Sequence, residues 1–166
     1  MHKAAAGGHT STVELLLTKG ASLEARDCIR CTPLYEAALR GHTSTVELLL
    51  AKGASTTARN WDNETPLHSA AKRGHSSVVE LLLAKSASIA AMDYSKSTPL
   101  HVAAEWGHSS VVDLLLKKGA SIEALDYRNN TPLHLATSKG HTDTMKLLEN
   151  KAAELGIPGN IRTVSG

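Results

Sequence analysis

Phenylalanine is absent from this chain of 166 residues, and tyrosine and tryptophan together supply only 3% of it. Hydrophobic residues nevertheless make up 42%, which is enough to fill a core. That core must be built from leucine, valine, isoleucine and alanine. Such small and aliphatic side chains suit closely packed helices.

Cysteine is also scarce: the chain has two, so a disulfide framework of the secreted type is excluded. The opening segment MHKAAAGGHT lacks the apolar stretch of a signal peptide. No apolar run approaches the length of about 18 residues that a membrane span needs. We therefore expect an intracellular protein, cytoplasmic or nuclear, that binds no membrane.

Charge of one sign does not dominate either. The formal net charge is +2 and the pI is near 8.6, short of the strongly basic balance of a dedicated nucleic-acid binder. We expect no nucleic acid as a partner.

What the chain does have is a strict period. The word TPL recurs every 33 residues, and so does a Gly-His pair followed by a VELLL-like run. The TPL words begin at Thr32, Thr65, Thr98 and Thr131, and the Gly-His pairs at Gly8, Gly41, Gly74, Gly107 and Gly140. A period of this length is typical of stacked supersecondary units.

Each word predicts a local structure. Thr32 is expected to cap a helix by accepting the N–H of Tyr35, with Pro33 at the first helical position. Gly41 then ends this short helix in the left-handed conformation.

A second helix is expected after Gly41. Ser44 and Glu47 have the spacing of a capping box. The same spacing occurs at Ser11/Glu14, Ser77/Glu80 and Ser110/Asp113. Because each helix pair alone has too little core to fold, stability must come from stacking.

The words TPLHSAAKRGH, TPLHVAAEWGH and TPLHLATSKGH at this period resemble ankyrin repeats. The resemblance implies an all-α repeat solenoid of helix-turn-helix pairs joined by β-hairpin-like fingers. We expect one domain over residues 1–157 and a flexible tail over 158–166. Its repeats would span about 1–20 (without its finger), 21–53, 54–86, 87–119 and 120–152, the last followed by a capping helix.

Two departures from the family pattern concern the fingers. The glycine usual at the finger turn is replaced by Arg30, Asn63, Lys96 and Asn129, of which the asparagines tolerate a positive φ best. The asparagine usual near the start of the finger is replaced by Glu24, Thr57, Ala90 and Glu123. We therefore expect somewhat softer fingers.

All nine histidines occupy repeated positions, either in TPLH or after the repeated glycine. This repetition favours structural hydrogen bonding over catalysis or metal binding. The alternative is a histidine ladder that makes stability sensitive to pH.

Cys28 and Cys31 form a C-x-x-C pair at the first finger tip. The favoured interpretation is two exposed contact residues. A reversible disulfide or sensor is an alternative, since Cys31 precedes a helix and neighbours Arg30, two features that lower a thiol pKa. A metal site is the third, although structural zinc takes four ligands. We expect no cofactor and no metal.

The aromatic residues give the stronger functional signal. Trp61, Tyr94 and Tyr127 share one finger-tip position in consecutive repeats, and Trp106 lies at the exposed end of a first helix. Tyr35 replaces a TPLH histidine, and we expect all five rings to avoid the core. Either the rings merely favour β geometry, or they form an aromatic ladder of binding anchors.

Further candidate binding residues surround the rings: Leu39, Arg40, Lys72, Arg73 and Lys139 on the first helices, and Arg30, Lys96 and Arg128 on the fingers. With Glu36, Glu64, Asp62 and Glu105, this face holds seven basic and four acidic residues. A mild preference for an acidic segment of a partner follows.

We interpret the chain as a protein-protein interaction module, a monomer that binds a partner protein through a concave face of finger tips and first helices. No nucleophile-base pair or phosphate loop appears outside the repeats, so we expect no enzyme. The alternatives are a structural spacer of a larger protein, single-stranded nucleic-acid binding by the rings and basic residues, and an engineered scaffold.

Overall fold

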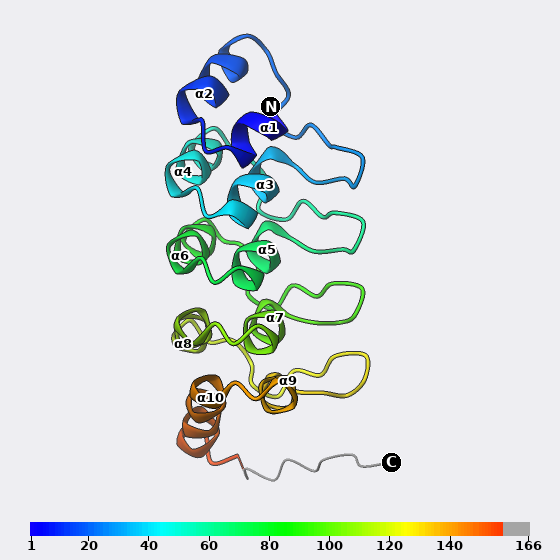
Figure 1. The fold of residues 1–166 in the computed structure, drawn as a ribbon, viewed down its shortest axis with the longest axis vertical. Coiled ribbons are helices and arrows are strands. Elements are labelled where there is room, and N and C mark those ends of the chain that lie inside the picture. Colours follow the sequence, from blue (N-terminus) through cyan, green and yellow to red (C-terminus); the bar gives the residue numbers. More distant parts are fainter. Residues whose placement is uncertain (158–166) are drawn as a thin grey trace.

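The computed structural model describes residues 1–157, and the predicted tail at 158–166 lies outside the described part. Helices stack in two parallel rows, with a row of fingers projecting from one side (Figure 1). The predicted all-α repeat solenoid is confirmed.

The first helices of the repeats form the row beside the fingers: α1 (His2–Ala6), α3 (Pro33–Arg40), α5 (Pro66–Lys72), α7 (Pro99–Glu105) and α9 (Pro132–Lys139). The second helices form the other row: α2 (Thr10–Thr18), α4 (Thr43–Ala51), α6 (Ser76–Ala84), α8 (Ser109–Lys117) and α10 (Thr142–Glu154). Each first helix packs against its own second helix and against the first helices of adjacent repeats.

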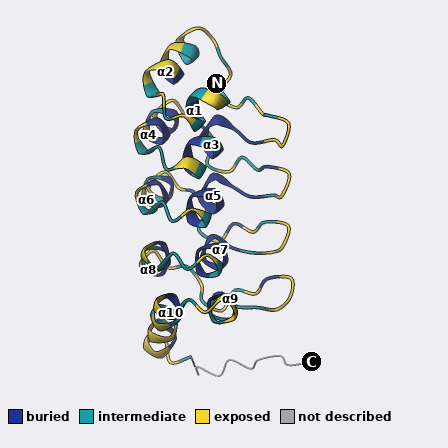
Figure 2. Cartoon of the chain, in the orientation of Figure 1, coloured by how far each residue is buried: buried dark blue, intermediate teal, exposed yellow. Residues whose placement is uncertain are grey.

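The core lies between the two rows and runs along the stack (Figure 2). Leu67 and Leu100 on first helices and Leu82 on a second helix are fully buried. Alanines at Ala70 and Ala103 let the helix axes approach closely. The absence of phenylalanine is therefore matched by an aliphatic core.

The starts and ends of the first helices follow from local sequence. Thr32 Oγ1 accepts the backbone N–H of Tyr35 at 3.2 Å, and Pro33 occupies the first helical position. Gly41 ends the helix with φ at 74°, a value that side chains with a Cβ adopt only at a cost.

The predicted capping boxes of the second helices are wrong. α4 begins at Thr43 with His42 at the N-cap position, and no side chain caps it, so Ser44 already lies inside the helix. The histidine turns to the preceding repeat instead, where His42 Nε2 donates to the carbonyl of Ala6 at 2.9 Å. The same bond recurs for His75 to Leu39, His108 to Lys72 and His141 to Glu105.

The fingers are built from turns and irregular segments, and they contain no β-strand within residues 1–157. Arg30, Asn63, Lys96 and Asn129 all have φ between 56° and 64°, as their place at the glycine turn predicts. A carboxylate or amide closes each finger, and in the first Asp27 Oδ1 accepts the N–H groups of Ile29 and Cys31 at 3.0 and 2.8 Å. Asn60, Asp93 and Asp126 accept backbone N–H groups in the same way in the later fingers. At the position of the missing asparagine, Glu24 Oε1 accepts the N–H of Ser55 in the next repeat at 2.8 Å.

Candidate functional site

Four of the five aromatic side chains are exposed, as predicted: Trp61 by 64%, Tyr94 by 75%, Trp106 by 50% and Tyr127 by 55%. Trp61, Tyr94 and Tyr127 stand on successive fingers, and Trp106 caps the C-terminal end of α7. We call the surface made by the finger tips and the exposed ends of the first helices the finger face. Large exposed rings of this kind are typical of interface anchors.

Backbone hydrogen bonds between fingers hold three of these rings in register. The N–H of Trp61 donates to the carbonyl of Ile29 at 3.1 Å, and the N–H of Tyr94 donates to that of Asp62 at 3.1 Å. The N–H of Tyr127 donates to Ser95 at 2.9 Å. The aromatic positions are therefore themselves the links between neighbouring fingers.

Arginines add a second set of links between fingers. Arg26 Nη1 donates to the carbonyl of Arg59 at 2.7 Å, and Arg59 Nη1 donates to that of Met92 at 2.8 Å. These contacts tie three fingers together, because each arginine also bonds within its own finger.

A cleft opens between the second and third fingers, which precede α5 and α7, and those two helices, with a volume of about 290 Å³. Trp106, at the C-terminal end of α7, and Tyr94 of the finger both border it. The remaining lining residues are Asp62, Glu64, Lys72, Asp93, Ser95, Ser97, Val102 and Glu105. Sequence reasoning overlooked Asp93, although its position in the column of Asp27, Asn60 and Asp126 marked it as a finger residue.

Tyr35 corrects the expectation that all rings avoid the core, since it is buried on α3. Its hydroxyl donates to Glu64 Oε2 at 2.5 Å, and Asn60 Nδ2 donates to the same oxygen at 3.0 Å. Lys72 Nζ lies 3.4 Å from Glu64 Oε1. Tyr35 thus joins its repeat to the next one, as a TPLH histidine does elsewhere.

This cluster sets the charge state of Glu64. Burial by itself raises the pKa of the Glu64 carboxyl, but the hydrogen bond from Tyr35 and the Lys72 ammonium outweigh it and lower the pKa overall. Burial and the Glu64 carboxylate both raise the pKa of Tyr35. The cluster therefore holds a carboxylate against a neutral phenol.

The basic candidates do not all lie together. Arg40, Arg73 and Lys139 are exposed at the ends of α3, α5 and α9, and Leu39 beside Arg40 is half-buried. Lys139 Nζ lies 3.6 Å from Glu105 Oε1. Arg30 lines a separate hollow between fingers with Glu24, Arg26 and Arg59, and Lys96 is exposed at its finger turn.

Cys31 corrects a second expectation. Cys28 is exposed as predicted, but Cys31 is buried, with its carbonyl bonded to the N–H of Asp27 at 3.1 Å. Burial and the carboxylates of Asp27 and Glu36 raise the pKa of the Cys31 thiol to about 12. The expected lowering by the helix and Arg30 is thus reversed, and Cys31 is not a contact residue.

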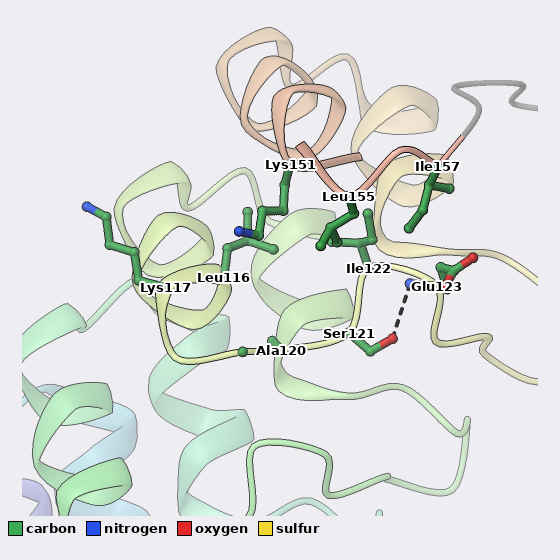
Figure 3. A pocket seen from close by; sticks show the side chains of 10 residues that line it. Leu116, Lys117, Ala120, Ser121, Ile122, Glu123, Lys151, Leu155 and Ile157 are labelled. Atoms are coloured by element: carbon green, nitrogen blue, oxygen red, sulfur yellow. Dashed lines mark hydrogen bonds between the residues drawn. The ribbon is translucent and has the colours of Figure 1, made fainter. Parts of the chain in front are cut away.

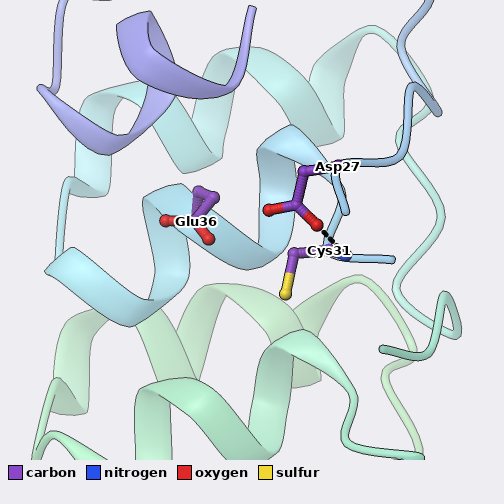
Figure 4. Close-up of side chains that lie close together, drawn as sticks. All are labelled: Asp27, Cys31 and Glu36. Carbon is purple, nitrogen blue, oxygen red and sulfur yellow. Dashed lines mark hydrogen bonds between the residues drawn. The ribbon is translucent and has the colours of Figure 1, made fainter. Parts of the chain in front are cut away.

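Asp27, Cys31 and Glu36 bring three ligand atoms within 4.8 Å of one another (Figure 4). Metal ions bind thiolate rather than thiol, and a thiol with a pKa of about 12 keeps its proton at neutral pH. One oxygen of Asp27 already closes the finger. The chemistry of this donor set fits a buried finger joint better than a metal centre.

The TPLH histidines act as structural links, in line with the favoured interpretation. His101 Nδ1 accepts the N–H of Thr98 at 3.2 Å, and its Nε2 donates to the carbonyl of Asn130 in the next finger at 3.1 Å. His68 makes the same pair of contacts to Thr65 and Ser97. Burial lowers the pKa of both imidazoles.

A second hollow of about 390 Å³ lies at the other end of the stack, where the last turn of α10 meets the loop after α8 (Figure 3). Leu155 and Ile157 contribute apolar surface, and Lys117, Glu123 and Lys151 contribute charge. None of the predicted binding residues lies there.

Within residues 1–157, the structure contains no helix long and apolar enough to cross a membrane.

Comparison with known protein families identifies the repeats. The model of the family described as ankyrin repeats (3 copies) matches residues 1–93, 57–126 and 92–158. No curated protein matched the chain. Ankyrin repeats are generally protein-protein interaction modules, and the family is typically non-enzymatic. The matches span most of the chain, which therefore belongs to the ankyrin-repeat family.

Proposed function

We propose that this chain binds a partner protein through its finger face, with Trp61, Tyr94, Trp106 and Tyr127 as the main anchors. The observation that carries the proposal is the exposure of these four rings, by 50 to 75%, on a surface whose positions are fixed by hydrogen bonds between fingers. A large aromatic side chain buries about 150–250 Å² when it is covered. Truncation of such an anchor costs about 2–4 kcal/mol of binding energy.

Two observations favour a protein over a single-stranded nucleic acid. Carboxylates of Asp62, Asp93 and Glu105 border the cleft beside Trp106, where they would repel phosphates. Lys72 and Lys139, which sequence counting included among the basic residues, are paired with Glu64 and Glu105.

The basic residues of the finger face that are not in ion pairs indicate the charge of the partner. Arg40 and Arg73 are exposed at the ends of successive first helices. Neither takes part in an ion pair within residues 1–157. An acidic stretch of the partner would be favoured over this part of the finger face.

The test is capture of proteins from a cell lysate by the immobilised chain and by Trp61→Ala/Tyr94→Ala/Trp106→Ala. The matched control is Leu15→Ala, which removes a side chain that is 58% exposed on α2, away from the fingers. Circular dichroism must first show equal helix content for all three proteins.

A protein retained by the wild type and the Leu15→Ala control but lost from the triple variant is the expected result. Equal retention by the triple variant would remove the aromatic anchors from the account. Capture of nothing by any of them would favour a spacer role, and capture of nucleic acid with a steep dependence on salt would favour single-stranded nucleic-acid binding.

A further inference from the structure

The cleft beside Trp106 has the wrong charge for the acidic partner segment that the overall count of residues suggests. Four carboxylates and one ammonium line it, which leaves an excess of three negative charges. Lys139 offsets one of these from the rim, at 3.6 Å from Glu105. The cleft therefore favours a cation.

Two of the carboxylates have oxygens free to bind a cationic ligand. Asp62 is exposed on the finger tip, and its side chain makes no hydrogen bond to another described residue. Asp93 uses Oδ1 to accept the N–H of Ser97 at 2.9 Å, which leaves its second oxygen. Glu64, by contrast, is occupied by Tyr35, Asn60 and Lys72.

The aromatic rings of the cleft are also suited to a cation. Trp106 and Tyr94 keep half or more of their surface exposed, and the face of such a ring attracts ammonium and guanidinium groups within about 6 Å. Among the described residues, the one cation placed over an aromatic ring is Arg128, whose Cζ lies 5.0 Å from the centre of Tyr127.

The cation over Tyr127 has no counterpart over Tyr94 in the preceding repeat within residues 1–157. Tyr127 and Tyr94 occupy the same finger position, so the residues that follow them in the sequence can be compared directly. Tyr127 is followed by Arg128, whose guanidinium lies over the Tyr127 ring and also donates to the Tyr127 hydroxyl. Tyr94 is followed by Ser95, and no cation of residues 1–157 lies over the Tyr94 ring.

We propose that the cleft bordered by Trp106, Tyr94, Asp62, Asp93 and Glu105 binds one arginine or lysine side chain of the partner protein. The proposal rests on the finger face being the binding surface and names what one part of it recognises. At about 290 Å³ the cleft is at the lower limit of small-molecule pockets, which span about 300–1,000 Å³. This size fits a single side chain rather than a larger ligand.

The experiment is a titration of the isotope-labelled chain followed by nuclear magnetic resonance. The probes are N-acetylarginine amide and N-acetyl-lysine amide. The neutral counterparts are N-acetylcitrulline amide, which has nearly the shape of the arginine probe, and N-acetylnorleucine amide. Salt concentration is kept constant throughout.

The cationic probes are expected to shift the Trp106 indole and the Tyr94 amide signals in a saturable manner, and the neutral probes are not. Comparison of the two cations tells whether guanidinium or ammonium is preferred. In Asp62→Asn/Glu105→Gln the dissociation constant should rise at least fivefold. The control Glu47→Gln/Glu80→Gln removes two exposed carboxylates from α4 and α6 and should leave it unchanged.

Equal shifts with citrulline and arginine probes, equal affinity of the two double variants, or no shift at Trp106 would each overturn the proposal. These failures differ from failure of the proposed function. If lysate capture depends on the aromatic anchors but the cleft binds neither cationic probe, the finger face still binds a protein. Only the proposal that the cleft binds a basic side chain of that protein is then wrong.

Discussion

Thr144 on α10 is the one described buried side-chain oxygen without a hydrogen-bond partner. Val78 and Val111 occupy the same repeat position and are buried without this polar group. Burial of an unpaired hydroxyl costs about 1–3 kcal/mol in proteins. Thr144→Val should therefore raise the free energy of unfolding by about 1 kcal/mol and the Tm by about 2–4 °C.

The control is Thr45→Val, at the same position of an earlier repeat. Thr45 Oγ1 lies 2.8 Å from Thr10 Oγ1, so this hydroxyl is paired. Chemical denaturation of both variants should show stabilisation for Thr144→Val alone. Destabilisation by both would mean that the hydroxyl of Thr144 has a partner after all.

Ser86 illustrates backbone strain at a single residue. Its φ is 61°, whereas Gly20, Gly53 and Gly119 fill the same position of other repeats with φ of 85°, 92° and 88°. A residue with a Cβ destabilises the folded state by about 1–2 kcal/mol when its backbone is left-handed. Replacement by glycine removes this cost, but part of the gain is offset because glycine increases the conformational entropy of the unfolded chain. Ser86→Gly should stabilise the protein by about 0.5–1 kcal/mol.

The reverse change supplies the control. A Cβ at Gly53 would meet no heavy atom within 4 Å, so Gly53→Ser tests the backbone alone. It should destabilise by about 1 kcal/mol in thermal unfolding. If both substitutions changed stability in the same direction, the left-handed backbone would not be the cause.

Single residues were also where sequence reasoning failed most clearly. Cys28 and Cys31 are three positions apart, and the residue at each position varies among the repeats, which predicts that both are exposed. The finger turns between them, which buries Cys31 against the next repeat while Cys28 stays exposed. Variation between repeats does not separate an exposed position from one at the repeat junction.

At the scale of elements, His2, His68 and His101 join the first helices α1, α5 and α7 to the following finger. His101 must be neutral to do so, because its Nδ1 accepts from Thr98 while Nε2 donates to Asn130. Protonation of Nδ1 would remove its bond to the Thr98 N–H. The lowered pKa of His68 and His101 agrees with this.

A pH dependence of stability follows. Since the folded pKa lies below the ordinary value of about 6.5, the unfolded chain binds more protons as the pH falls. The stability that these histidines provide is complete above about pH 6.5 and is lost as pH falls toward the folded pKa. His101→Gln should reduce the slope of unfolding free energy against pH by up to about 1.4 kcal/mol per unit.

Urea unfolding at a series of pH values between about 5 and 7 measures this slope. The exposed His9, which makes no side-chain hydrogen bond to a described residue, gives the matched control His9→Gln. Equal slopes for His101→Gln and wild type would show that the imidazole titrates alike in the folded and unfolded chains.

The elements themselves were predictable where their signals are local. Thr32, Pro33 and Gly41 act within one helix, and the structure has them in their expected roles. The second helices were misjudged because their N-terminal histidines bond to carbonyls 36 residues earlier. A Ser-x-x-Glu spacing carries no information about such a distant partner.

At the scale of the whole molecule, the period predicted the stack and the exposure of four rings. It did not predict how charges gather between repeats. Asp62, Asp93 and Glu105 lie in two different repeats and border one cleft only after stacking. Likewise the pairing of Lys139 with Glu105 crosses a repeat junction, which counting along the chain does not detect.

The central claim is that a partner protein lies on the finger face, and site-specific photocrosslinking tests it most directly. A benzophenone amino acid would replace Tyr94, which is 75% exposed at a finger tip, or Leu15, which is 58% exposed on α2. The account predicts, after irradiation in lysate, a discrete protein adduct from position 94 and none from position 15. Adducts from position 15 alone, or the same adducts from both, would contradict it.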